Sequence, residues 1–377
     1  FWLKPFWLKT LKTLALHSGH AAYTLQSETA GGKIMPGVQL LAVAAVLTAR
    51  AVCSHVPHNQ REKLLPPEGS GWRGVVNPEG VVNFTSKYGK PLHIYRVFTL
   101  DRLASGELDG FIRGGGIVWL NYVTPHWKLW STSSPEVDLK ISELAGNISK
   151  HAPAKLYFCP FHEPDHNIDP ERGRSPEDYR NMWAYVQKQF REVHGVTNAV
   201  YVMDYSIQVG RKTGANVAPL WPGVDRVDWL FFNIFEKTSS RRTGIDYNDL
   251  VAPIYNGFIK NSSLDCPSGG KCNFTDLPWG LGAFGCFQSA NVTNRKKFFV
   301  EAKAGLSKFP KFKAYLYFDT HTDFITEDVM PEFMDFITDP FFTKNDLMDA
   351  NLTRNESATP LAVTSGAADD NMEALLV

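Results

Sequence analysis

KLYFCPFHEPD, from Lys155 to Asp165, is the stretch that decides the expected fold. Its apolar run Leu156–Cys159 predicts a buried strand, and Pro164 ends that strand because proline has no backbone N–H for a neighbouring strand. Glu163 therefore stands at the carboxyl end of a hydrophobic strand. A carboxylate is costly to bury without a partner, so a simple core role is not expected. In α/β barrels this end of the strands carries the chemistry, which makes Glu163 the first candidate functional residue.

Eight runs of this kind follow one another along the chain, separated by helical or loop segments. Most are continuous apolar runs, as expected for parallel strands that are covered on both faces. Eight strands with crossovers over about 270 residues predict an α/β fold, a single-domain (β/α)8 TIM barrel. The expected strands are Trp72–Pro78, Leu92–Phe98, Gly116–Tyr122, Lys155–His162, Ala199–Tyr205, Asp228–Phe235, Trp279–Gly285 and Lys313–Asp319.

A doubly wound open sheet is the alternative, but such sheets usually have fewer strands. They also tend to hold phosphates with a glycine-rich loop that opens a helix. Gly114-Gly115-Gly116 precedes a strand instead, so it predicts a turn and not a nucleotide loop. No CxxC or HxxxH spacing indicates a metal site. We therefore expect no cofactor and no metal.

The clearest predicted helix is Pro176–Val193. Ser175 precedes it as an N-cap, apolar residues recur in it at three- and four-residue spacing, and Gly195 ends it. Two further helices are expected at Asn294–Ser307 and Thr326–Ile337.

The two ends of the chain differ in composition from the expected barrel, which covers residues 70–342. Residues 1–34 are interpreted as a leader or gene-model artefact, with an amphipathic transit peptide as the alternative. Residues 35–53 combine an apolar core with following small residues, a pattern typical of a secretory signal peptide. Residues 343–377 are polar and small and predict a disordered tail. The last apolar residues are too few for an anchor-attachment signal, so no membrane anchor is expected.

Charge and sequons indicate where the protein acts. Lysine plus arginine number 39, as do aspartate plus glutamate, so no net field favours nucleic acid or an anionic membrane. An excess of N-x-S/T sequons supports a secreted, extracellular glycoprotein that carries N-glycans. The sequons are at Asn83, Asn147, Asn261, Asn273, Asn291, Asn351 and Asn355.

The cysteines allow two disulfides after Cys53 has left with the signal peptide. Cys266 and Cys272 bracket a short loop that a disulfide could close, and Cys159 and Cys286 would then remain as a second pair.

At this point the residues resemble a known family. CPFHEPD followed by SPEDYRNMWAYVQKQFREVHGVTNAVYV is similar to the fourth strand, crossover helix and fifth strand of glycoside hydrolase family 26. That family consists mostly of β-mannanases, with some β-glucanases and xylanases, on a (β/α)8 barrel. WPGVDRVDWLFFNIF resembles its sixth strand, LPWGLGAFG its seventh and KAYLYFDT its eighth. The resemblance covers roughly Trp72–Pro340 and is strongest between Phe158 and Phe235.

The resemblance implies a retaining mechanism, in which two carboxylates lie about 5–5.5 Å apart and one protonates the leaving oxygen while the other attacks the sugar. Glu163 matches the acid/base. His162 matches a residue that holds substrate and tunes the acid, and Trp119 matches a tryptophan that lines the cleft. Asp165, two residues after the acid, is placed with these substrate-binding residues.

Two positions depart from the family pattern. Ala283 stands where the family has its nucleophilic glutamate, and a methyl group cannot attack a sugar. Phe235 stands where the family has a tyrosine whose hydroxyl contacts that nucleophile. We expect both positions to line the substrate site, and their joint change indicates that standard retaining hydrolysis is absent.

Another carboxylate could replace the missing one. An inverting enzyme needs a base about 6.5–9.5 Å from the acid, with a water molecule between them. Asp204 and Asp319 end predicted strands and Glu236 follows one; all three are candidate bases, although acids at strand ends often only cap loops. Asp228 begins its strand and is expected to be structural.

Trp127 and Trp130 follow the third expected strand in a polar loop. Exposure is expected for both, and two exposed tryptophans would form an apolar patch that requires a partner.

The sequence therefore predicts a secreted, glycosidase-fold protein whose cleft binds a β-linked polysaccharide, mannan-like by resemblance, without hydrolysing it. The alternative is an active glycoside hydrolase that cleaves β-1,4-glycosidic bonds with Glu163 as general acid and a relocated base.

Overall fold

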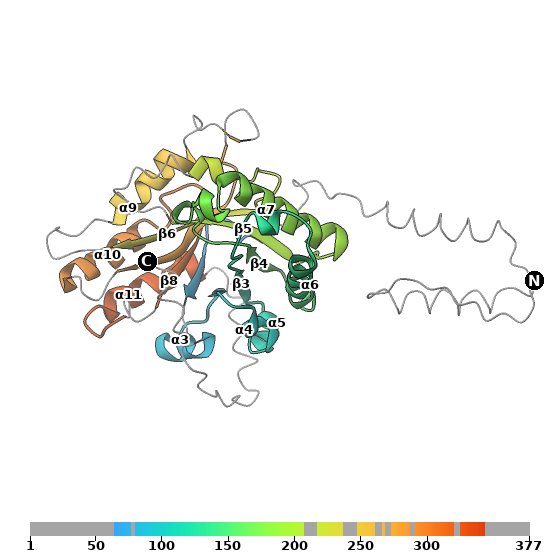
Figure 1. Ribbon diagram of the computed structural model, residues 1–377. Coiled ribbons are helices and arrows are strands. Elements are labelled where there is room, and N and C mark those ends of the chain that lie inside the picture. The colour runs from blue at the N-terminus through green and yellow to red at the C-terminus, as the bar shows by residue number, and fades with distance from the viewer. Residues whose placement is uncertain are drawn as a thin grey trace, which may run out of the picture. The chain divides into compact units, whose positions relative to one another are not determined.

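Eight parallel strands close into a barrel in chain order, with β1 pairing with β8 (Figure 1). The computed structural model describes residues 64–76, 80–206, 217–236, 247–260, 266–267, 273–286, 291–319 and 325–343. The strands are β1 (Trp72–Val76), β2 (Ile94–Val97), β3 (Ile117–Asn121), β4 (Leu156–Cys159), β5 (Ala199–Tyr205), β6 (Trp229–Glu236), β7 (Trp279–Cys286) and β8 (Phe312–Phe318). Each of the eight predicted strands is present, so the predicted (β/α)8 barrel is confirmed.

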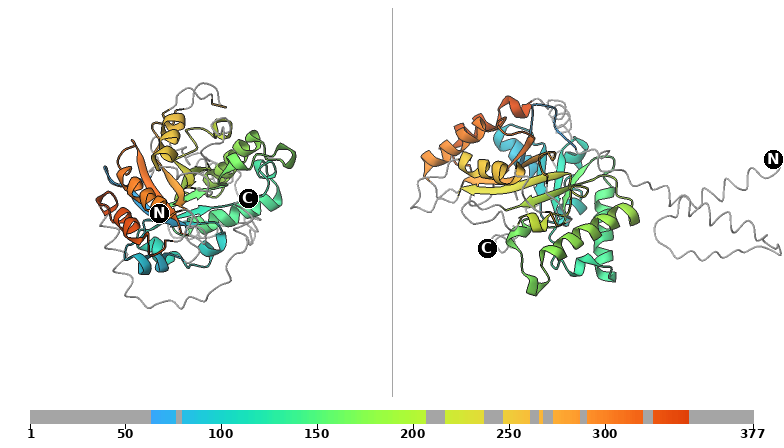
Figure 2. Two further views of the ribbon diagram at one scale, coloured as in Figure 1. Left: turned by 90° about the vertical axis from the view of Figure 1, so that its left-hand side faces the viewer. Right: turned by 90° about the horizontal axis from the view of Figure 1, so that it is seen from above.

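Helices follow the strands and lie outside the barrel, as Figures 1 and 2 show. They are α3 (Val81–Tyr88), α4 (Leu100–Ala104), α5 (Asp109–Arg113), α6 (Pro135–Ser149), α7 (Pro176–Lys188), α9 (Tyr247–Ile254), α10 (Val292–Ala304), α11 (Met330–Ile337) and α12 (Pro340–Thr343). Short 3-10 turns are η2 (Leu129–Ser131), η3 (Pro164–His166), η4 (Pro170–Arg172) and η6 (Ala218–Leu220), and π-turns are η5 (Gln189–Val193) and η7 (Tyr255–Ile259).

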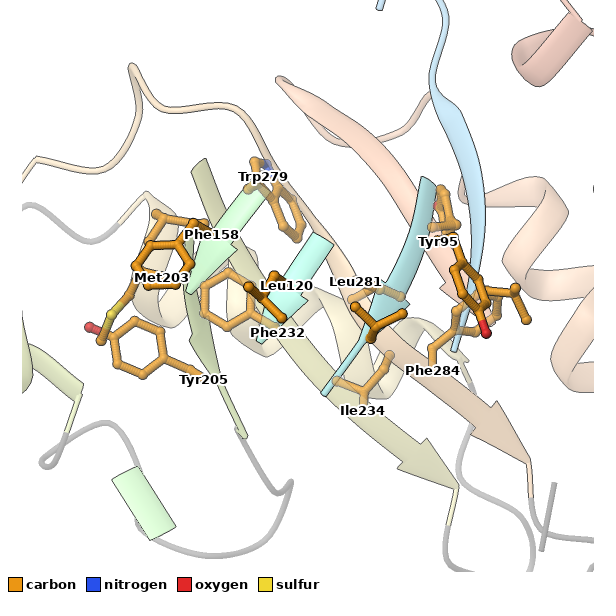
Figure 3. Packing of buried hydrophobic residues seen from close by; sticks show 14 of the residues in the cluster. Tyr95, Leu120, Phe158, Met203, Tyr205, Phe232, Ile234, Trp279, Leu281 and Phe284 are labelled. Atoms are coloured by element: carbon orange, nitrogen blue, oxygen red, sulfur yellow. The ribbon is translucent and has the colours of Figure 1, made fainter. Parts of the chain in front are cut away.

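Strand side chains divide into two layers because successive residues point to opposite faces. The outward layer packs under the helices, and Figure 3 labels Leu120, Phe232 and Leu281 among its members. The inward layer is rich in aromatic rings, such as Trp119 and Phe231, whose centroids are 4.5 Å apart. These rings fill the barrel interior and form the floor on which the polar residues at the carboxyl ends of the strands rest.

The predicted helix Pro176–Val193 is confirmed as α7 continued by the π-turn η5. Ser175 accepts a hydrogen bond from the Asp178 N–H, and the Asp178 carboxylate accepts one from the Ser175 N–H, so the two residues form a capping box. The third predicted helix starts later than expected, at Met330, because Thr326 takes part in a turn with Asp328.

Trp127 and Trp130 are buried, so their predicted exposure is wrong. The Trp127 ring packs edge-on against Phe161 and Tyr179, with centroids 5.2 and 5.0 Å away. Trp130 packs against Tyr122. The polar loop folds back onto α7 and places both indoles in the outward layer, which composition alone does not reveal.

Cys159 and Cys286 are buried thiols, so their predicted pairing is wrong. They end β4 and β7, and β5 and β6 lie between these strands in the barrel. A disulfide needs Cα atoms within about 7 Å, closer than strands so far apart in the barrel allow. The other predicted pair cannot be followed, because Cys272 lies outside the described residues.

The barrel elements run from Trp72 to Thr343. The predicted leader (1–34), signal peptide (35–53) and all but the first residue of the predicted tail lie outside the described residues. In the part of the chain that the structure describes, no helix is both long and apolar enough to cross a membrane.

Candidate active site

Glu163 lies just beyond β4 in a strained backbone conformation. Its φ and ψ are 49° and 46°, the left-handed region that residues other than glycine seldom adopt. The Glu163 N–H donates to the Asp204 carbonyl over 2.9 Å, and the Asn167 side chain donates to the Glu163 carbonyl, also over 2.9 Å. Strain of this kind persists where the surroundings impose it, commonly at functional sites. The predicted position of Glu163 at the carboxyl end of the strand agrees with this geometry.

A polar network joins Glu163 to β2, β5 and β6. Asn233 Nδ2 donates to Glu163 Oε1 over 2.6 Å and to Asp204 Oδ2 over 3.2 Å. Arg96 Nη1 donates to Asn233 Oδ1 over 3.1 Å, and Arg96 Nη2 pairs with Asp204 Oδ2 at 2.5 Å. All four side chains are buried. The Arg96–Asp204 ion pair therefore anchors the network inside the barrel, and Glu163 is its outermost member.

The surroundings favour the protonated form of Glu163. Burial raises the pKa of its carboxyl above the ordinary value, while the hydrogen bond from Asn233 and the charge of Arg96 oppose this rise. A raised pKa is the direction expected for a general acid, which must carry a proton to donate. This is the chemistry expected of the residue that matches the acid/base.

Asp204 is close to Glu163 but is not available to a substrate. One amide nitrogen, Asn233 Nδ2, bonds both carboxyl groups, and Asp204 is 0 % exposed. Burial raises the pKa of Asp204 to about 6, against the lowering effect of Arg96. Its Oδ2 is already bonded to Arg96 and Asn233. The carboxylate therefore lies beneath the acid, bonded to Arg96, and not across a cleft from it.

Ala283 faces the barrel interior and pairs in register with Asn233. It is 4 % exposed. Phe235, two residues after Asn233 in β6, is half-buried and packs edge-on against Phe318, with ring centroids 5.2 Å apart. The two positions predicted to depart from the family pattern thus belong to one apolar cluster on the inward side of β6, β7 and β8.

Gly282 makes room for the polar network. A Cβ added there would lie 2.8 Å from Asp204 Oδ1, 3.0 Å from Arg96 Nη1 and 2.7 Å from the Trp119 ring. A β-bulge places this residue inward as well as Ala283, because Phe232 pairs with Leu281 and Asn233 with Ala283. Because Gly282 has no side chain, the Arg96–Asp204 ion pair has room at the centre of the barrel.

His162 and Trp119 are both close to Arg96. His162 is buried, with its ring edge-on to Phe98 at 5.1 Å, and burial together with Arg96 lowers its pKa to about 3. The imidazole is therefore neutral above about pH 4. Trp119 is 0 % exposed, and the guanidinium of Arg96 covers its ring at 4.3 Å. This arrangement leaves no open face of Trp119 for a sugar, in contrast to its expected role.

Asp165 turns away from the network toward β5. Its Oδ1 accepts a hydrogen bond from the Ser206 N–H over 3.0 Å, and the residue is buried. Burial raises the pKa of Asp165 to about 6, although the Ser206 N–H opposes the shift.

Asp165→Asn is expected to stabilise the protein at pH 7. The folded-state pKa lies above the ordinary value of 3.8, so the folded protein binds the proton more tightly, and its free energy of unfolding falls as pH rises from about 4 to 6. Asparagine keeps the acceptor for Ser206 and removes the buried charge. Urea denaturation should show a gain of up to about 2 kcal/mol at pH 7 and little gain at pH 4.

The matched control for this prediction is Asp276→Asn, whose side chain is 82 % exposed and pairs with Lys311. It should change the free energy of unfolding by less than about 0.5 kcal/mol at either pH. An equal effect of Asp165→Asn at pH 4 and pH 7 would contradict the assigned cause.

The remaining candidate bases stand at other strand ends. Asp319 follows β8, is buried and accepts a hydrogen bond from the Tyr88 hydroxyl over 3.3 Å. Glu236 is the last residue of β6, and its side chain is outside the described atoms. Asp228 precedes β6 and accepts from the Tyr201 N–H over 2.8 Å, in agreement with the structural role predicted for it.

No cluster of three or more histidine, cysteine, aspartate or glutamate residues that could bind a metal ion occurs among the described residues.

Sequence reasoning missed Arg96 and Asn233. Each carried a signal, because a charged or amide side chain inside an apolar strand (LHIYRVF and WLFFNIF) must find a partner in the barrel interior. The sequence does not say which partner it finds, since the network joins four strands that are far apart in the chain.

Known proteins were compared with the chain by sequence and by structure. No protein-family model matches the chain, and no curated protein matches it. Among solved structures, the glycoside hydrolase family 26 domain of a Prevotella bryantii endo-β-mannanase/endo-β-glucanase has 12% identity and a TM-score of 0.51, covering 80% of this chain and 94% of that one.

Two further solved structures are similar. A ruminal family 26 endo-β-1,4-mannanase has 12% identity and a TM-score of 0.51, with 78% of this chain and 72% of that one covered. A β-mannanase from a symbiotic protist of the termite Reticulitermes speratus, complexed with gluco-manno-oligosaccharide, has 10% identity and a TM-score of 0.50, with 74% and 90% covered. At such identities the likeness concerns the fold: the chain has the (β/α)8 barrel of mannanase-like glycosidases.

Proposed function

We propose that this protein binds a β-linked, mannan-like polysaccharide at the carboxyl end of its barrel and does not hydrolyse it by the retaining mechanism. The observation that carries this proposal is Ala283, which faces the interior in register with Asn233, the residue that bonds the acid Glu163. The proposal joins the mannanase-like fold to a site with one carboxyl whose pKa is raised and an apolar residue at the position where the resemblance places the nucleophile.

The other carboxylates support this interpretation. Asp204 is fully buried and paired with Arg96, so attack on a sugar ring would require breaking the ion pair. Asp319 is buried beside Tyr88. Phe235 packs its ring on Phe318 and has no hydroxyl that could assist a nucleophile. A barrel with these substitutions keeps its architecture and loses the group that forms the covalent intermediate.

The second candidate function is inverting hydrolysis of β-1,4-linkages with Glu163 as general acid. It is favoured by the raised pKa of Glu163, which suits a proton donor. Its base would be Glu236, at the end of β6, or Asp319, just after β8, since Asp204 shares an amide with the acid and is paired with Arg96.

One experiment separates the two functions. The protein and its Glu163→Gln variant are incubated with β-1,4-mannan, glucomannan, xylan and cellulose, and both binding and release of reducing ends are measured. We expect the protein to bind a mannan-type glycan and to release no reducing ends. Release that Glu163→Gln abolishes would overturn the proposal, and product stereochemistry by proton NMR would show whether the reaction inverts. Failure to bind any of the glycans would refute the binding function.

Secretion and N-glycosylation are part of the proposal. The predicted acceptors Asn83, Asn273 and Asn291 are exposed, and Asn147 is half-buried on α6. Exposed acceptors are accessible to a glycan, and an extracellular location would bring the protein to polysaccharides. Treatment of the secreted protein with a peptide N-glycosidase should reduce its apparent mass.

A further inference from the structure

Asn233 occupies a position that neither the expected mechanism nor the family resemblance assigns. It lies on the inward face of β6 with three partners, Arg96, Asp204 and Glu163. Each partner restricts what the amide can do, and together they determine its orientation.

The orientation of the amide follows from Arg96. A guanidinium has only N–H donors, so the Asn233 atom that faces Arg96 Nη1 at 3.1 Å must be the acceptor, Oδ1. Nδ2 then faces the carboxyl groups. A flipped amide would set donor against donor at Arg96 and oxygen against oxygen at both carboxyls. Arg96 is itself held by Asp204 and by the faces of Trp119 and Phe98, so it cannot move to accept a flipped amide.

The two hydrogens of Nδ2 serve two acceptors, Glu163 Oε1 at 2.6 Å and Asp204 Oδ2 at 3.2 Å. Oε1 already accepts a hydrogen bond from Asn233 Nδ2, so a proton on Oε1 would point at the hydrogen of that N–H group. In the protonated form of Glu163, the proton is therefore better placed on Oε2.

We propose that Asn233 is a positioning residue for Glu163: its amide, oriented by Arg96, holds Oε1 and leaves Oε2 for a bound ligand. The recognition of a glycan through Oε2 rests on the proposed function. The hydrogen bond and its effect on the acid do not.

Several charged or titratable groups face Glu163. Arg96 approaches from β2 and Asp204 from β5, while Asp165 and His166 belong to the turn that follows the acid. Asp165 raises the pKa of Glu163, and Arg96 and His166 lower it. Only Asn233 bonds the carboxyl directly among the described residues, so its removal should act on Glu163 more than on its neighbours.

The test measures the acid itself, without any glycan. Glutamate labelled with carbon-13 at Cδ is incorporated, and the Glu163 signal is identified by its loss in Glu163→Gln. We expect the titration midpoint of Glu163 to rise in Asn233→Ala, because the carboxylate loses a donor, and to rise further in Asn233→Asp, which replaces that donor with a third carboxyl.

Asn198→Ala is the matched control. Asn198 is equally buried, and it donates to the Ile148 and Ala154 carbonyls, away from Glu163. Its loss should lower stability without moving the Glu163 midpoint. An unchanged midpoint in a folded Asn233 variant, or an equal shift in Asn198→Ala, would overturn the proposal. If Asn233→Ala does not fold, the near-isosteric Asn233→Asp provides the same test. Failure of glycan binding would refute the proposed function and leave this titration unaffected.

Discussion

The Ala283→Glu variant is expected to hydrolyse β-1,4-mannan with retention of anomeric configuration, whereas the parent is not. Ala283 pairs in register with Asn233, which bonds the acid Glu163 over 2.6 Å, so a carboxylate at position 283 would belong to the same part of the barrel mouth. Restoring the attacking group should raise the rate on the order of 10³-fold or more, since loss of a catalytic nucleophile costs enzymes at least that much. Reducing-end assays measure the rate, and proton NMR of the first product gives the configuration.

The matched control is Ala283→Gln, which has the same shape as the glutamate variant and cannot attack. It should be as inactive as the parent. Adding Glu163→Gln to Ala283→Glu should lower the rate by about 10²–10⁴-fold, the usual contribution of a general acid. Equal activity of Ala283→Glu and Ala283→Gln would contradict the assignment of this position, and activity in the parent would favour the inverting alternative.

Arg96→Met is expected to lower the free energy of unfolding by about 3–5 kcal/mol, the usual cost of breaking a buried ion pair by removing one partner. Asp204 would be left as a fully buried carboxylate whose remaining bond is to Asn233. Urea denaturation at pH 7 measures the loss. Because Arg96 also orients the Asn233 amide, the same variant should weaken the hydrogen bond that holds the Glu163 carboxyl group.

Two comparisons make this prediction specific. Arg172→Ala breaks an ion pair with Asp169 whose side chains are 79% and 39% exposed, and it should cost less than about 1 kcal/mol. The double variant Arg96→Met with Asp204→Leu should be more stable than Arg96→Met alone, because it leaves no buried charge. If Arg96→Met lowered the free energy of unfolding no more than Arg172→Ala does, the Arg96–Asp204 pair would not be what stabilises the network.

The barrel could be predicted from the sequence because its strands are covered on both faces. β4 is a continuous apolar run, and β5 and β8 are each interrupted by a single charged residue, a pattern that leaves few other structures open to them. The general position of Glu163 followed from the same reasoning, although β4 ends at Cys159 and not at the predicted His162, so Glu163 comes four residues after the strand. Helix α7 was equally predictable, because its N-cap depends only on residues that are adjacent in the chain.

The polar network could not be predicted, because its partners lie far apart in the chain. Arg96 and Asp204 are 108 residues apart, and only barrel closure brings β2 and β5 within reach of one ion pair. Burial of Trp127 and Trp130 was missed for a similar reason: the loop is polar, but the surface it folds onto belongs to α7. Pattern and local chemistry define elements, whereas contacts between distant elements depend on the closed topology.

The bulge in β7 has a consequence for any comparison made by position alone. Strands normally keep a strict phase, one residue in and the next one out, but Gly282 and Ala283 break it by both turning inward. Beyond Leu281, counting every second residue selects the wrong side of the strand. Which residue of β7 faces the interior beside Asn233 therefore depends on a single extra residue in the ladder.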